Sequence, residues 1–240
     1  MDAKRDLDDI QQHADTFISG SISLYEQTLL PLLADYGYDL ASHMNDGKMV
    51  ELDNDYYPVV YNYYRWSSDK YGTFNWFVLQ GSYKYASNIV ACLAFPHNPL
   101  VPALSMNLNF KLDARTFSII LGFRDNGHLT TDTLSHIREI KENVDSPIYT
   151  DTNSNNFLGI RSSFEISASI INKSLENAQR HIQWWFDLQN NSATLPEASY
   201  DLYIQQYKST LINLHEEENT IYDELFGNKW LINLFKNQIL

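Results

Sequence analysis

Polar side chains alternate with apolar ones in the segment ALSMNLNFK, residues 103–111. In an extended strand Ser105, Asn107 and Asn109 point to one face, together with Lys111, while the apolar residues between them point to the other. Hydroxyl and amide groups at this spacing can bind a polar ligand, but the solvated face of a half-buried strand has the same composition. The pattern therefore predicts one core face and a second face that either is solvated or lines a polar cavity.

The densest cluster of titratable side chains is HEEEN, residues 215–219. On composition alone, such a charge run is typical of the solvated face of a helix. The histidines are scattered, and no two of them have the i, i+4 spacing of a helical metal site. The sequence contains no GxGxxG, HExxH or GxSxG motif, and its single cysteine, Cys92, is interpreted as a buried structural thiol. No common nucleotide, metal or nucleophile motif is therefore present.

Composition and charge limit the classes of protein to which the chain can belong. The chain has 240 residues, of which 44% are hydrophobic and 14% aromatic, so it can bury the core of one large domain. Its net charge of −13 makes binding to a nucleic-acid backbone unfavourable. The sequence has no apolar run long enough to span a membrane, and its acidic N-terminus does not resemble a signal peptide. We therefore expect a cytoplasmic protein that has no membrane span and does not bind nucleic acid.

Helical patterns precede and follow a block of strands, which predicts an α+β fold in one domain over residues 1–240. Residues 1–43 have helical spacing, with Pro31 expected to kink or divide the helix, and NDGK at 45–48 is predicted to be a turn. The block 49–123 contains closely spaced segments that indicate an antiparallel sheet: 59–66, 73–80, 88–95, 103–110 and 116–123. The mainly helical part, 130–240, contains these segments: a capped helix at 130–143, a short extended piece at 157–164, and helices at 163–190, 198–218 and from 228 onward.

Three segments, in this order along the chain, resemble the ferredoxin-dependent bilin reductase superfamily, and its red chlorophyll catabolite reductase branch most of all. They are FVLQGSYKY with CLAFPHNPLVPALSMNLNF, then FLGIRSSFEISASI, and then the C-terminal YIQQYKSTLINLHEEENTIYDELFGNKWLINLFKNQIL. Chains of that superfamily end in a helix with a functional acid, an LFG or MFG step and a final amphipathic helix. The resemblance covers roughly residues 70–240.

The resemblance implies an α/β/α sandwich in which an open-chain tetrapyrrole lies between the sheet and the C-terminal helices. It implies no bound metal or flavin, with electrons from reduced ferredoxin and protons from side chains. The acid of the sheet falls on Asn107, and a histidine that some members carry falls near Ala91. The acid of the C-terminal helix falls on Glu216, or on Glu217 if the register slips by one.

An amide cannot donate a proton as a carboxylic acid does, so Asn107 is expected to orient the substrate. Glu216 is then the expected proton donor, with His215 as a second candidate. The residues expected to contact the substrate are Ser105, Asn109, Lys111, Arg161, Ser162 and Phe164.

Two other functions stay open: a non-catalytic protein that binds linear tetrapyrroles, and an acidic protein-interaction domain. A basic patch is expected to meet ferredoxin, and it would consist of Lys84, Lys111, Arg115 and Arg124. The sequence leaves a homodimer open, and it specifies neither the pigment nor the double bond that is reduced.

Overall fold

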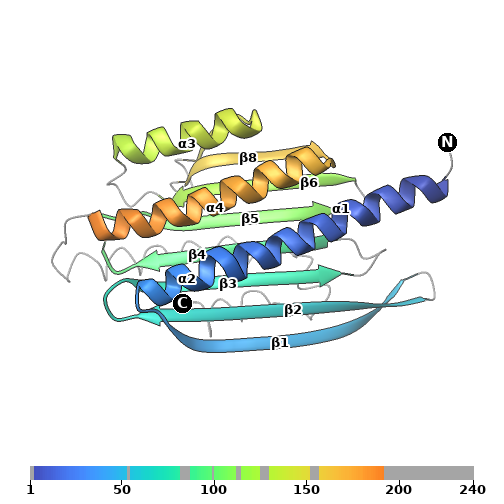
Figure 1. The fold of residues 1–240 in the computed structure, drawn as a ribbon, viewed down its shortest axis with the longest axis horizontal. Coiled ribbons are helices and arrows are strands. Elements are labelled where there is room, and N and C mark those ends of the chain that lie inside the picture. The colour runs from blue at the N-terminus through green and yellow to red at the C-terminus, as the bar shows by residue number, and fades with distance from the viewer. Residues whose placement is uncertain are drawn as a thin grey trace.

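The computed structural model describes residues 3–52, 55–81, 87–98, 100–111, 115–124, 130–151 and 157–191. Helices at both ends of this part of the chain pack against one antiparallel sheet (Figure 1). The predicted α+β fold, an antiparallel sheet with flanking helices, is therefore confirmed. The helices expected at 198–218 and from 228 onward lie outside the described residues.

The N-terminal helical segment is divided, as Pro31 predicts. It consists of α1 (Ala3–Ser23), a π-helical segment η1 (Leu24–Leu29) and α2 (Leu30–Asp35). Pro31 has no N–H to donate to the preceding turn, and the regular α-helical ladder is lost in the turn directly before it. The segment ends at Asp35, earlier than the expected residue 43, because the chain enters the first strand at Asp39.

The described strands form one eight-stranded sheet, in the order β1-β2-β3-β4-β5-β6-β8-β7, and all neighbours are antiparallel. The strands are β1 (Asp39–Leu52), β2 (Asp55–Ser68), β3 (Gly72–Gly81), β4 (Ser87–Pro96), β5 (Ala103–Lys111), β6 (Thr116–Arg124), β7 (Ile148–Asp151) and β8 (Phe157–Glu165). The turn predicted at 45–48 is wrong. Asp46 and Gly47 pair with Tyr61 and Val60 inside the long β1–β2 hairpin, so cross-strand pairing overrides the local turn signal.

Two further helices follow the strands. α3 (Thr131–Val144) begins at Thr130, whose side chain accepts a hydrogen bond from the backbone N–H of Thr133, so the predicted cap is confirmed. α4 (Ala168–Asn191) begins later than the predicted residue 163, because 163–165 still pair with β6 as the end of β8. None of the described helices has the length and apolarity to cross a membrane.

The two faces of the sheet differ. We call the face that carries Met106 and Leu121, and that packs against the helices, the helix face. The opposite face, which carries Asn107 and Ile120, is the distal face. In Figure 1, α1, α2 and α4 cross in front of the strands.

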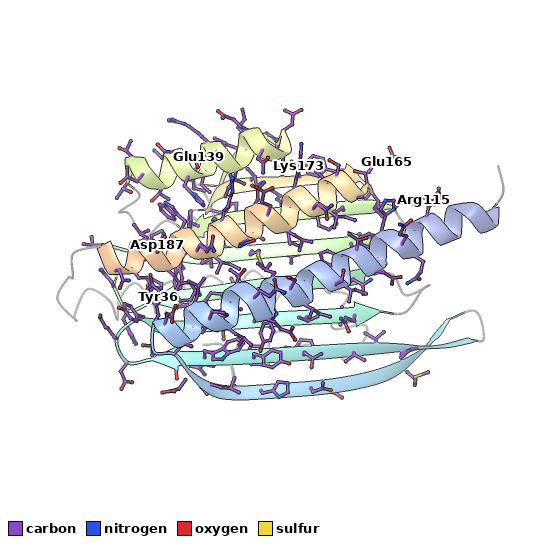
Figure 2. All side chains as sticks on the ribbon, viewed as in Figure 1. Tyr36, Arg115, Glu139, Glu165, Lys173 and Asp187 are labelled. Carbon is purple, nitrogen blue, oxygen red and sulfur yellow. The ribbon has the colours of Figure 1, made fainter. Side chains whose placement is uncertain are left out.

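Aromatic packing joins the helices to the helix face. Phe17 of α1 lies 5.4 Å from Phe117 of β6, measured between ring centroids. The indole N–H of Trp185, a fully buried residue of α4, donates to the Pro102 carbonyl at 2.8 Å. The Tyr36 hydroxyl, just after α2, donates to a carboxylate oxygen of Asp187 on α4 at 3.4 Å (Figure 2). These contacts hold α1, α2 and α4 as one layer on the sheet.

The β2–β3 hairpin depends on the glycine that begins β3. Gly72 has φ of +108°, and a Cβ there would lie 2.1 Å from the Phe95 carbonyl oxygen of β4. Replacing Gly72 with Ala is therefore expected to lower the free energy of unfolding by about 3 kcal/mol. Urea denaturation measures this loss.

The matched control is Gly37→Ala. Gly37 also has positive φ, +64°, but a Cβ there meets no atom within 4 Å. Its replacement is expected to lower the free energy of unfolding by only about 1 kcal/mol. Equal losses at both positions would contradict the close approach of β4 as the cause.

Candidate functional site

The polar row predicted on β5 lies on the distal face. Asn107 pairs with Ala91 of β4 on one side and with Ile120 of β6 on the other. Ile120 in turn pairs with Arg161 of β8, so Arg161 lies on the same face, two strands from Asn107. The two backbone positions are about 10 Å apart. Asn107 and Arg161 are thus brought to one surface although more than 50 residues separate them in the sequence.

Burial distinguishes this polar row on β5 from the face of an ordinary solvated strand. Ser105 is buried, Asn107 and Asn109 are half-buried, and only Lys111, at the end of the strand, is exposed. The side-chain oxygen of Asn109 is buried and has no hydrogen-bond partner in the described part of the chain. An unpaired buried acceptor destabilises a fold by about 1–3 kcal/mol. The row is therefore more enclosed than the face of an ordinary solvated strand.

A second set of side chains on the distal face was not predicted. The Tyr63 hydroxyl of β2 donates to the Asn75 side-chain oxygen of β3 at 2.8 Å, and the Asn75 amide donates to the Leu93 carbonyl at 3.0 Å. Tyr63 and Asn75 are both fully buried. Burial raises the pKa of Tyr63 above its usual value, although the charge of Arg65 acts in the opposite direction. The alternation in TFNWFVLQ places Asn75 opposite Phe74 and Trp76, which is the one sequence signal for this pair.

The distal face thus has two halves. The half on β2–β4 is mostly apolar and aromatic, and it carries Tyr61, Tyr63, Phe77, Leu79 and Ile89. The half on β5–β8 is polar and carries the Asn107 row, Arg161 and a Ser118–Ser163 contact of 3.1 Å. The apolar half is buried, whereas the polar half includes half-buried and exposed side chains.

Two predicted contact residues lie on the other side of the sheet. Ser162 pairs with Ile119 and contacts Ser146 through the two hydroxyl oxygens at 2.5 Å, on the helix face. Phe164 is half-buried and packs against the helix-face core. Successive residues of a strand point to opposite faces, so Ser162 and Phe164 cannot join Arg161 on the distal face.

Only some of the other predicted residues lie in the described part of the chain. His215, Glu216 and Glu217 lie outside the described residues, as does Lys84. Lys111 and Arg115 are exposed at one end of the sheet, where Figure 2 shows Arg115 near Glu165. Arg124 lies at the opposite end of β6, about 30 Å away along the strand. The four basic residues therefore do not form one patch.

A buried histidine pair joins α3, α4 and β6 on the helix face. His136 Nε2 lies 3.2 Å from His181 Nδ1, and His181 Nε2 lies 3.0 Å from the Gly122 carbonyl oxygen. Because a carbonyl only accepts, His181 Nε2 donates to it, and the neutral ring then accepts from His136 through Nδ1. The His136 ring stacks on Trp184 at 4.6 Å between centroids.

Burial keeps both rings neutral. It lowers the pKa of His136 to about 4, helped by the positive charge of Arg180. It lowers the pKa of His181 to about 3, helped by His136. Among the described residues no three His, Cys, Asp or Glu side chains gather in a way that could hold a metal ion. The pair is thus a structural feature of the helix layer, remote from the distal face.

The open antiparallel sheet and its helix layer form an α+β fold, and the distal face of the sheet has an apolar half and a polar half. No family model matches the sequence, and no curated protein matches it. Among solved structures, the chain is similar to phytochromobilin synthase from tomato, solved as a crystal structure in complex with biliverdin. The TM-score is 0.58 with 13% identity, over 89% of this chain and 84% of that chain. The similarity shows that the two proteins share a fold.

Proposed function

We propose that this chain binds an open-chain tetrapyrrole against the distal face of the sheet and reduces it with electrons from ferredoxin. The observation that carries the proposal is the composition of that face, where a buried aromatic half adjoins a row with the unpartnered Asn109 oxygen. The fold adds support, because it is shared with a protein whose crystal structure contains biliverdin.

The two halves of the distal face match the chemistry of a bilin. The apolar side chains of the distal face, Phe77 among them, match the flat, conjugated pyrrole rings in polarity. The amide oxygens of Asn107 and Asn109 can accept hydrogen bonds from pyrrole N–H groups. Arg161 can pair with a propionate in a bidentate arrangement. Lys111 can neutralise a second carboxylate from the exposed end of β5.

Reduction of one double bond adds two electrons and two protons to the pigment. Ferredoxin supplies electrons singly, so the pigment passes through a radical that must be kept from water, and the apolar half of the distal face serves this need. Protons require a titratable donor close to the reacting carbon. We propose Glu216 as that donor and His215 as a second candidate, with Asn107 orienting the pigment. No bound cofactor of the chain is required.

A second candidate function is pigment binding without reduction. The observation that favours it is the amide of Asn107, which lies on the distal face at the position where the resemblance places an acid. Such a protein would bind the same pigments through the same contacts, and it would leave their double bonds intact.

An anaerobic absorption assay separates these functions. The protein is mixed with biliverdin, and separately with red chlorophyll catabolite, before reduced ferredoxin is added. We expect a shift of the pigment spectrum on mixing and bleaching or a further shift on reduction. Turnover of red chlorophyll catabolite alone would support that branch of the superfamily. A shift without turnover would support a binding protein, and no shift with either pigment would contradict both functions.

A variant of Arg161 tests whether the pigment binds on the distal face. Arg161→Gln is expected to weaken pigment binding about tenfold, because it removes the proposed propionate partner. Spectral titration measures the dissociation constant. The control is Arg138→Gln, which removes the same charge from an exposed position on α3, on the helix side of the sheet. Equal weakening by both variants would indicate a general charge effect and contradict the placement.

A further inference from the structure

A cleft of about 250 Å³ opens on the helix face, between the N-terminal helical segment and strands β2–β4. It lies on the opposite side of the sheet from the proposed pigment site. Buried side chains form part of its lining, among them Phe17, Trp76 and Val90. A volume of this size suits a ligand much smaller than a tetrapyrrole.

Aromatic rings form the walls of the cleft. Tyr25 of η1 lies 5.3 Å from Tyr64 of β2 and 5.9 Å from Trp76 of β3, measured between ring centroids. Neither tyrosine hydroxyl forms a hydrogen bond within the described structure, and both side chains are only half-buried. Three aromatic rings and two hydroxyl oxygens without a hydrogen-bond partner in the described structure therefore line one space, although one face of Tyr64 is stacked on His43 at 4.3 Å between centroids.

The charge of the cleft has one sign. No Lys, Arg or His is among its lining residues, and Glu26, next to Tyr25, is the one lining side chain that is charged at neutral pH. Burial and the neighbouring Tyr64 and Glu26 raise the pKa of Tyr25 to about 12. The Glu26 carboxylate thus lies within electrostatic reach of the aromatic walls. An anion such as a propionate finds hydroxyl and amide donors here but no cationic side chain, whereas an ammonium finds both a carboxylate and aromatic rings.

The backbone holds this arrangement in place. Tyr25 and Glu26 both belong to the π-helical segment that precedes Pro31, and π-helical segments occur frequently at functional sites. On the sheet side, the Asn62 oxygen accepts from the Asn45 amide at 2.6 Å, and the Asn88 oxygen accepts from the Gly81 N–H at 3.2 Å. Two of the three amides of the lining, Asn62 and Asn88, are therefore fixed by neighbouring strands, as a preformed site requires.

We propose that this cleft binds a small aromatic amine in its ammonium form, with the ammonium near the Glu26 carboxylate and the rims of the Tyr25 and Tyr64 rings, and with the aromatic ring against Trp76. Cation–π attraction is strongest where the cation is partly desolvated, and the adjacent carboxylate adds a charge partner. The occupant is cationic and small, so the proposal does not depend on tetrapyrrole binding at the distal face.

Calorimetric titration with matched probes tests the proposal. Phenethylamine carries an ammonium and phenylacetate carries a carboxylate on a similar frame. Phenethylamine is expected to bind with a dissociation constant of about 1 mM and at least about tenfold more tightly than phenylacetate. Equal binding of the two probes, or no binding of phenethylamine, would overturn the proposal.

The net charge of −13 attracts any cation, so the site needs its own control. Glu26→Gln is expected to weaken phenethylamine binding about five- to tenfold, whereas Asp35→Asn, an exposed acid on α2, is expected to change it less than about twofold. Tyr64→Leu keeps an apolar side chain without a π face and is expected to weaken binding about fivefold. Circular dichroism checks that the variants fold, and equal effects of Glu26→Gln and Asp35→Asn would contradict the site.

Discussion

Glu216→Gln is expected to lower the rate of ferredoxin-dependent pigment reduction at least about 100-fold while pigment binding changes less than about threefold. Gln keeps the size and hydrogen-bonding capacity of the side chain but has no proton to transfer. The expectation rests on the proposed function, and it concerns a residue outside the described part of the chain.

The described residues of the distal face offer no better donor. Asn107 is an amide, and the Tyr63 hydroxyl donates to Asn75 and has a raised pKa, so it holds its proton firmly. Carboxyl groups of this face, such as Asp46 on the edge strand β1 and Glu165 at the end of β8, are exposed and lie away from its centre. We therefore propose that a carboxyl from elsewhere in the chain protonates the pigment, and the resemblance to the bilin reductases places that acid at Glu216.

Single-turnover spectroscopy with reduced ferredoxin measures the rate, and spectral titration measures binding. The matched control is Glu217→Gln, which removes the same charge one position along and is expected to retain most of the activity. A Glu216→Gln variant that reduces the pigment at the normal rate would contradict the assignment. Loss of activity in Glu217→Gln alone would indicate that Glu217, and not Glu216, donates the proton.

Acid is expected to unfold the protein through the buried histidine pair. In the folded state the pKa of His136 is about 4 and that of His181 about 3, whereas an unfolded histidine has a pKa of about 6.5. Below about pH 6.5 the unfolded chain therefore binds more protons than the folded chain, and stability falls as the pH falls. Between about pH 7 and about pH 5 each histidine is expected to remove about 2 kcal/mol from the free energy of unfolding.

Urea denaturation at several pH values measures this slope. His136→Gln keeps a hydrogen-bond donor near His181 but does not titrate, so about half of the loss should disappear. His97→Gln is the comparison variant, because it removes a histidine from the exposed turn after β4, outside the buried pair. An unchanged slope in His136→Gln would show that other groups cause the acid sensitivity.

Periodicity predicted the features that depend on neighbouring residues. The alternation in ALSMNLNFK correctly separated Met106 from Asn107, because a strand has a period of two wherever it lies in a sheet. Thr130 and the spacing of Ile137 and Ile140 predicted α3, because a cap and an apolar stripe are local properties. Pro31 predicted the interruption of the first helix, because a missing N–H acts within one turn.

Pairing between distant segments determined the rest. NDGK is part of a strand because β2 pairs with it. Arg161, and not Ser162, lies on the same face as Asn107, because both Asn107 and Arg161 pair with Ile120 of β6. The His136–His181 contact joins residues 45 positions apart, and the cleft joins residues 17–26 to residues 62–90.

The sequence by itself determined the α+β class, the residues on each face of β5 and the absence of GxGxxG, HExxH and GxSxG motifs. Each of these follows from local pattern or composition. Only the tertiary structure decided which polar residues share a surface, which are buried and how far their pKa values shift. These properties arise from burial and from long-range contacts, and neither can be read from spacing along the chain.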